Sequence, residues 1–352
     1  MRDFPRSGES AAWALAGTAA AVLLLHLFRS ILWPFALALV IVILIQALVR
    51  VVVTVWPWAD RRAVMLSAGL AALGGLVVVV LFVLPGLAEF GGDLPTLVGR
   101  IDGVLGQVSA KLSLEDPVTL QALVGSVDAR TIATWTLAGG RSLVSGLVLT
   151  GLFVIFLLLT WATIARRIRL ASAGRGRGRS RLLVERSIRG VETYLWIQTV
   201  TGMMISGASA LIMFVAGLEH WAVWAAALFM LAYIPFLGVA VGSIAPSLFA
   251  LLQFPSIWPS LLIFLGIQTV AFVVGNLVTP RLQAKAQNID PCAGLLAVGG
   301  WSLVWGLPGA FLAIPLTLVL MYQLAGTRSL RWIAVLGQFA ALIVSHKKPE
   351  PY

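Results

Sequence analysis

The sequence predicts an all-α, polytopic integral membrane protein with about seven or eight transmembrane helices and further amphipathic helices outside the membrane. Of its 352 residues, 60% are hydrophobic and only 11% are charged, against roughly 25% charged in an ordinary soluble domain. The mean hydropathy is +0.98, and several apolar runs exceed the roughly 18 residues that mark a membrane-spanning helix. This composition excludes a soluble enzyme and a disordered protein.

Residues 1–88 are expected to hold three membrane spans. Two arginines precede an apolar run over about 11–28, which looks like a signal peptide but has no small-residue cleavage site after it. We therefore expect a retained first span there, a second over about 31–55 and a third over about 63–88. A short interfacial loop at 56–62 joins the last two.

The next segment, 89–140, differs in character because acids gather in it and apolar residues recur every three or four positions from Leu94 to Leu112. That period is typical of a helix with one apolar face. We expect this external segment to form amphipathic helices in the membrane interface. A small helical hairpin that packs on the spans outside the membrane explains the pattern equally well.

A fourth span is expected over 141–165, and the segment after it, 166–192, carries nine arginines from Arg166 to Arg189. Its alternating glycines and arginines predict a flexible loop. Short loops rich in Lys and Arg stay cytoplasmic, so this loop, the 56–62 loop and the N-terminus are predicted on the cytoplasmic face of a bacterial inner membrane. Contact with anionic lipid is an additional expectation. A nucleic-acid partner is not needed to explain the charge, and none is expected.

Residues 193–326 are predicted to form a C-terminal membrane bundle with broken helices. Prolines and glycines interrupt the long apolar runs at 221–253 and 293–324, and one straight helix cannot absorb several prolines. The first run forms either two spans joined by a tight turn or a broken, re-entrant element. The tail, 327–352, is expected at the interface or in the cytoplasm.

Two groups of motifs in this bundle carry a family resemblance. One joins Tyr194–Thr199 to the later Tyr233–Gly238, and the other joins Gly275–Leu282 to Gly299–Leu316. In this order and spacing they resemble the autoinducer-2 exporter family of bacterial inner-membrane permeases. The resemblance implies a multispanning transporter that forms homo-oligomers and carries a small polar solute such as autoinducer-2. Some relatives are described as sodium or lithium/proton antiporters.

The chain departs from the family pattern at Thr279, where many relatives have an acid or an amide. A carboxylate is the usual group for coupling transport to protons or sodium inside a membrane. The departure therefore argues against cation antiport in this chain.

A transport path needs polar groups inside the membrane, and many transporters build their binding sites at helix breaks. The sequence offers two kinds of candidate, which are helix breaks and polar side chains near span ends. Structural roles compete with each, because prolines also make packing kinks, amides also join helices, and an arginine at a span end also snorkels to the interface. The transport-path candidates are Pro235, Gly238, Pro246, Gln268, Asn276, Pro280, Arg281, Gly306, Pro308, Gly309 and Pro315.

No catalytic site, cofactor or metal is predicted. The single cysteine is Cys292, the three histidines lie far apart, and the chain has no HExxH, GxSxG or P-loop motif. Glu192 and Glu219 lie at span ends and are expected to be solvated. Three functions remain open: a secondary transporter that exports a small polar solute, a sodium (lithium)/proton antiporter, and a membrane scaffold that transports nothing.

Overall fold

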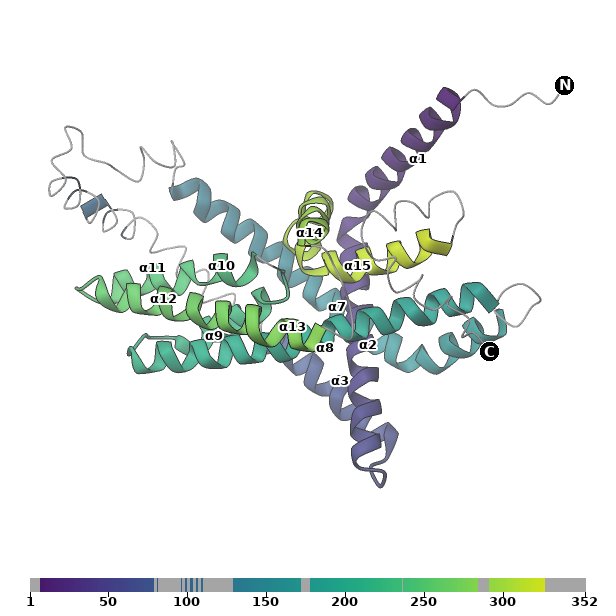
Figure 1. Ribbon diagram of the computed structural model, residues 1–352, viewed down its shortest axis with the longest axis horizontal. Coiled ribbons are helices and arrows are strands. Elements are labelled where there is room, and N and C mark those ends of the chain that lie inside the picture. The colour runs from purple at the N-terminus through teal and green to yellow at the C-terminus, as the bar shows by residue number, and fades with distance from the viewer. Residues whose placement is uncertain are drawn as a thin grey trace, which may run out of the picture.

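The computed structural model confirms the all-α membrane class, because each secondary-structure element among the described residues is a helix. The described part of the chain contains six helices long and apolar enough to cross a membrane, together with four shorter apolar helices. Figure 1 shows these helices in two groups that meet near the centre of the molecule. The structure describes residues 7–78, 81, 96, 99, 102, 103, 106, 109, 129–171, 178–235, 237–283 and 291–326.

The first group is an N-terminal unit built around α2. The apolar residues Ala38, Val42, Ile45 and Val49 are spaced along one face of this helix, and they pack against α7 in a core of aliphatic side chains. Gly69 of α3 faces Leu158 of α7. The helices of this unit are α1 (Ser7–Leu27), α2 (Arg29–Val55), α3 (Arg61–Val78) and α7 (Ala129–Ala171).

The first two predicted spans do not form a hairpin. The Phe28 N–H donates to the Leu24 carbonyl (3.0 Å), and the Leu32 N–H donates to the Phe28 carbonyl (3.0 Å), so helical bonding continues through the boundary. In Figure 1, α1 runs on into α2 with a bend. The first described turn of α1, at Ser7, therefore lies beyond the opposite end of α2 from the 56–60 turn. The side of the membrane on which the N-terminus lies stays a prediction.

The second group, which we call the arm, extends along α8. Helix α9 runs back along α8, and α11 then runs outward beside α12 (Figure 1). The arm consists of α8 (Gly178–Val215), α9 (Trp221–Leu231), α10 (Gly238–Gly242), α11 (Ile244–Gln253), α12 (Trp258–Val273), the π-helix η2 (Val274–Val278) and α13 (Thr279–Gln283).

The α9–α11 segment is a hairpin that leaves and returns at the same end of α8. Gln253 ties the two ends together, because its amide donates to the Gly217 carbonyl and its side-chain oxygen accepts from the Glu219 N–H, both at 2.8 Å. Helix α9 has 11 residues and is about 16 Å long, against roughly 30 Å for the hydrocarbon core. The 221–253 run is thus a hairpin broken at its inner turn, and whether it forms two spans or a re-entrant element stays a prediction.

Helices α14 (Pro291–Trp305) and α15 (Leu307–Gly326) sit where the two groups meet. In Figure 1, α14 is seen nearly end-on and α15 lies across the view, so the chain turns steeply between them. Gly306 makes this turn with φ of +67°, a conformation that glycine adopts without steric cost.

The basic segment 166–192 is mostly helical, which corrects the expected loop. Helix α7 continues to Ala171 and α8 begins at Gly178, so seven of the nine arginines lie in these two helices. Three expectations fall wholly or mainly outside the described residues: the amphipathic external segment up to 128, the centre of the basic segment at 172–177, and the tail at 327–352.

Candidate functional site

The inner turn of the α9–α11 hairpin (Ala232–Leu237, apart from Phe236) breaks a helix in the interior of the protein. Carbonyl groups at a helix end have no partner within the helix, and lipid cannot supply one. Side chains of α8 supply it here: the Tyr194 hydroxyl donates to the Tyr233 carbonyl (3.1 Å), and the Gln198 amide donates to the Ala232 carbonyl. The break is therefore satisfied by protein groups on the neighbouring helix.

A hydroxyl pair adds a third contact between the inner turn and α8. The Thr199 hydroxyl lies 2.7 Å from the Tyr233 hydroxyl and 2.7 Å from the Leu195 carbonyl. A hydroxyl has one proton to donate, and the threonine uses it on the carbonyl. Tyr233 is then the donor in the pair. Hydroxyls and amides that form hydrogen bonds with one another in this way can also form hydrogen bonds with an uncharged polar solute instead.

The second break is the α14–α15 turn. A Cβ built on Gly309 would lie 2.0 Å from the Trp301 carbonyl oxygen, so only glycine allows the two helices to approach this closely. Pro308 stands in the first turn of α15, where its missing N–H costs nothing. The Trp301 indole donates to the Thr317 hydroxyl at 3.0 Å and ties the helices together beyond the turn.

The two breaks meet. The Tyr233 ring stacks on Phe311, with ring centroids 5.0 Å apart and planes at 29°. Ile234 packs in one buried cluster with Val298, Ala310 and Ala313 of α14 and α15. We call this meeting point the junction, and it consists of Tyr194, Gln198, Thr199, Ala232, Tyr233, Ile234, Val298, Trp301, Ala310, Phe311 and Ala313.

The structure brings some transport-path candidates to the junction and leaves others away from it. Pro235 belongs to the inner turn, and Gly238 follows it as the first residue of α10, where a Cβ would lie 1.7 Å from the Leu231 carbonyl oxygen. Four further candidates, Gly306, Pro308, Gly309 and Pro315, belong to the α14–α15 turn and to α15. Candidates elsewhere in the arm are Pro246 (buried, α11), Gln268 (half-buried, α12), Asn276 (exposed, η2), Pro280 and Arg281 (both exposed, α13).

The π-helix around Asn276 has a local cause. Pro280 has no N–H for the carbonyl four residues earlier, and the preceding turn widens: the Thr279 N–H donates to the Val274 carbonyl, five residues back. The Thr279 hydroxyl donates to the same carbonyl (3.0 Å), while the Asn276 amide donates to the Phe272 carbonyl (2.8 Å). Such π-bulges are frequent at functional sites, and the role of Asn276 in transport remains a prediction.

Sequence reasoning missed four residues of the junction as site residues. Tyr194, Gln198, Thr199 and Tyr233 entered the sequence analysis only as parts of the family motifs. The available signal was polar spacing on α8, because positions 194, 198 and 201 are polar and lie on one helical face. What that face contacts could not be read from the sequence.

A charged pair links α8 to the N-terminal unit and corrects the expectation that Glu192 is solvated. The Arg50 guanidinium of α2 lies 2.6 Å from the Glu192 carboxylate, whose side chain is only 15% exposed. Glu192 is two residues from Tyr194 and therefore projects from nearly the opposite side of α8. Helix α8 thus contacts the inner turn on one face and the half-exposed Arg50 of α2 on the other.

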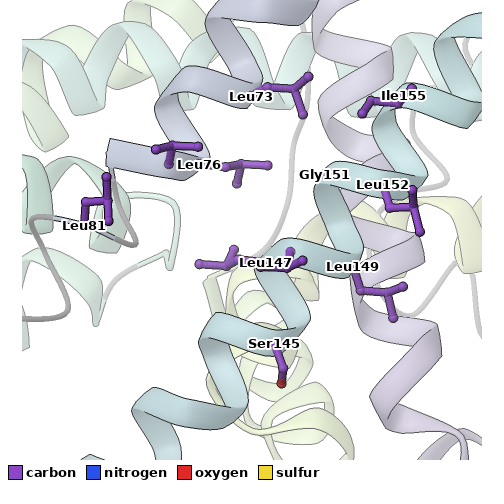
Figure 2. A pocket seen from close by; sticks show the side chains of 11 residues that line it. Leu73, Leu76, Leu81, Ser145, Leu147, Leu149, Gly151, Leu152 and Ile155 are labelled. Atoms are coloured by element: carbon purple, nitrogen blue, oxygen red, sulfur yellow. The ribbon is translucent and has the colours of Figure 1, made fainter.

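An apolar cleft of about 760 Å³ lies elsewhere, between α3 and α7 (Figure 2). Aliphatic side chains such as Leu73, Leu76 and Leu147 line it, and among the described residues of its wall Ser145 is the one with a polar side chain. Figure 2 shows these side chains converging from the two helices. Such a surface suits hydrocarbon and has few groups that could orient a polar solute.

The fold and the junction together define a class, a multispanning α-helical membrane transporter whose broken helices meet inside the protein. The sequence profile described as AI-2E family transporter matches residues 14–327. The chain belongs to this family.

Named relatives agree with that assignment. AI-2 transport protein TqsA of Escherichia coli (strain K12) is 27% identical over 318 residues, which cover 87% of this chain and 89% of the relative. A protein of Haemophilus influenzae, whose name marks it provisionally as a transport protein, is 23% identical over 341 residues, covering 92% of this chain and 95% of the relative. YhhT of Escherichia coli (strain K12), named with the same provisional role, is 22% identical over 328 residues, covering 89% of each chain.

Proposed function

We propose that the protein is a secondary transporter that exports a small polar organic solute through the junction. The observation that supports this most directly is the meeting of two helix breaks, whose polar groups belong to side chains and backbone of different helices. In the described conformation these groups are bonded to one another, and the inner turn is packed against α8. This is the closed state, and transport requires the inner turn to separate from α8.

Autoinducer-2 is the first solute to test, because the name of the Escherichia coli relative assigns it AI-2 transport. The described side chains that bond at the junction are hydroxyls, an amide and an indole. The hydroxyls and the amide both donate and accept hydrogen bonds, and the indole donates only; such a set suits an uncharged solute rich in oxygen.

A reversible disulfide tests the proposal. A Cβ on Gly202 of α8 would lie 3.3 Å from the Ala232 Cβ, close to the Cβ separation of a disulfide, about 3.5–4.5 Å. In a Cys292→Ser background, the pair Gly202→Cys and Ala232→Cys should fix the inner turn to α8. Oxidation should stop the flux of autoinducer-2 into proteoliposomes, and reduction should restore it.

The matched control is a cysteine pair at Gly69 and Leu158, which face each other between α3 and α7. Cross-linking this pair should leave flux unchanged. Equal flux from oxidised and reduced forms of the Gly202–Ala232 pair would refute transport through the junction. If reduced protein moves no solute at all, a scaffold role is favoured, and sodium-driven pH change without solute flux would favour the antiporter.

We further propose that the C-terminal ends of α2 and α7 face the cytoplasm. Gly69 faces Leu158 and Leu73 faces Gly151, so α3 and α7 are antiparallel, and the 56–60 turn lies toward the basic end of α7. This supports a shared side for these two basic segments. Reporter fusions at 56–60 and 172–177 test it, and a periplasmic signal from either one would refute it.

A further inference from the structure

One exposed face of α8 combines two kinds of side chain that the transport proposal does not use. Near the start of the helix, Arg186 and Arg189 are exposed. Further along, the apolar side chains of Trp196 and Met203 are 48% and 53% exposed. These four positions lie within about 100° of one another around a helix with 3.6 residues per turn. The face is therefore basic at one end and apolar beyond it.

Tyr322 of α15 brings a further polar group to the basic end. Its ring lies against Gly190 of α8, where a Cβ would be 2.9 Å from Cε2 of the ring and 3.3 Å from the hydroxyl oxygen. Gly190 directly follows Arg189 and stands one turn after Arg186, whose charge interacts with the Tyr322 hydroxyl. One hydroxyl and two arginine side chains, contributed by two helices, are therefore neighbours at this end of α8.

The acids near these arginines leave most of the donors available. Glu185 lies 3.9 Å from Arg189, and the two side chains are 40% and 72% exposed, so the pair is a weak surface contact. Glu192 is bonded to Arg50 at 2.6 Å. No ion pair joins Arg186 to a carboxylate in the described part of the chain. Because a guanidinium has five N–H donors and no acceptor, this end of α8 can bind an anion.

The length of α8 indicates where this end lies relative to a bilayer. The candidate span Leu182–Val215 has 34 residues, whereas about 20 residues cross the hydrocarbon core. A crossing that ends at Val215 begins near Trp196, and tryptophan is typical of that boundary. Arg189 then lies about 10 Å beyond the boundary, which is the level of the lipid headgroups. Met203 lies about 10 Å on the other side of it, within the hydrocarbon.

We propose that Arg186, Arg189 and Tyr322 bind the phosphate of one anionic phospholipid, whose acyl chains lie along Trp196 and Met203. The charges are complementary, because guanidinium groups form strong, often bidentate hydrogen bonds with phosphate. Basic clusters beside the cytoplasmic end of a span also attract anionic lipids. The site narrows the lipid contact expected from composition to named side chains of two helices. A purely topogenic role of the arginines requires neither a donor from α15 nor an apolar surface beside them.

Native mass spectrometry of the full chain in detergent tests the site. The protein is mixed with phosphatidylglycerol or phosphatidylethanolamine, which differ in net charge, and bound lipids are counted. The wild type should retain one phosphatidylglycerol in preference to phosphatidylethanolamine. Arg186→Gln combined with Arg189→Gln should lower that preference roughly tenfold. Tyr322→Phe removes one hydroxyl and no charge, and it should lower the preference about threefold.

The matched control removes the same charge at another span end. Arg61 and Arg62 are exposed at the start of α3, and Arg61→Gln combined with Arg62→Gln should keep the wild-type preference. Equal loss in the two double variants would show that net charge alone attracts lipid, and it would overturn the proposal. A wild type without preference, or an unchanged preference in Tyr322→Phe, would overturn it as well.

The same spectra report the alternative occupant of this face, a second copy of the chain. If the double variant at 186 and 189 changes the number of subunits and leaves lipid retention unchanged, a subunit contact covers the face and the lipid site is refuted. Excess inorganic phosphate should not displace phosphatidylglycerol, because it has no acyl chains, and displacement would refute the apolar part of the site. These measurements need no solute flux, so their outcome is separate from that of the transport proposal.

Discussion

The N-terminal unit and the junction solve the same problem of packing helices in a membrane by different means. Between α2 and α7, aliphatic side chains such as Val42 and Val154 fill the contact, and the helices are continuous. At the junction, two helices are broken, and α8 side chains donate hydrogen bonds to backbone carbonyls that have no partner within a helix. The Gln198 amide does so at the Ala232 carbonyl. The comparison teaches that side-chain donors at the junction satisfy carbonyls freed by a helix break, whereas the α2–α7 contact is mainly apolar packing that supports it.

The largest effect is expected at the close backbone approach of Gly238 to Leu231, on either side of the inner turn. In Gly238→Ala, the new Cβ would lie 1.7 Å from the Leu231 carbonyl oxygen, so the inner turn must move. We expect a loss of about 3 kcal/mol in the free energy of unfolding, measured by chemical denaturation in detergent micelles. Gly207→Ala is the matched control, because nothing lies within 4 Å of its Cβ position, and it should not destabilise the protein.

The second-largest effect is expected from loss of a hydrogen bond between α8 and the backbone of the inner turn. Gln198→Leu leaves the Ala232 carbonyl without this donor, and we expect a cost of about 2 kcal/mol together with reduced flux in proteoliposomes. Thr193→Val removes a hydroxyl that bonds only within α8, to Arg189 (2.9 Å), and should leave flux unchanged. If the two variants behave alike, the junction has no special role.

A smaller effect in the N-terminal unit should separate stability from transport. Ile45→Val removes one methylene from the buried α2–α7 core and should cost about 1 kcal/mol. Flux per folded protein should stay at the wild-type level, because this core only supports the junction. A drop in flux beyond the loss of folded protein would contradict the division into support and transport regions.

The smallest effect is expected in the apolar cleft. Ser145→Ala removes a polar side chain from its otherwise aliphatic described lining and should change the free energy of unfolding by less than about 0.5 kcal/mol. Solute flux should not change either. A clear loss of flux in this variant would place the solute path in the N-terminal unit instead.

The fold class and the places where helices break could be predicted from sequence, because both depend on local properties. Hydropathy predicts spans, and prolines such as Pro235 and Pro308 interrupt helices whatever the tertiary arrangement around them. The bend at Phe28 was interpreted as a boundary between two separate spans. Hydropathy shows which segments are apolar, but not whether the chain turns back between them. The helical parts of 166–192 were missed because glycine and arginine composition predicts a loop.

The junction itself could not be predicted, because its contacts join distant parts of the chain. Tyr194 and Tyr233 are 39 residues apart, and Phe311 is further still. Glu192 also illustrates the limit: its sequence position indicated a solvated span end, whereas Arg50 of another helix covers it. Which faces of two helices meet depends on the tertiary arrangement, and a single sequence without related sequences carries no direct record of it.

The first and last parts of the described chain are joined by a pair of reciprocal bonds. The His26 ring donates through Nδ1 to the Val304 carbonyl (2.9 Å), and the Trp305 indole donates to the Leu25 carbonyl (3.0 Å). At roughly 5–20 residues per second, a ribosome adds the 280 residues between Leu25 and Trp305 in roughly 14–56 s. During synthesis, α1 is therefore made long before the Val304–Trp305 segment that it bonds to. The contact between them can form only when translation is nearly complete.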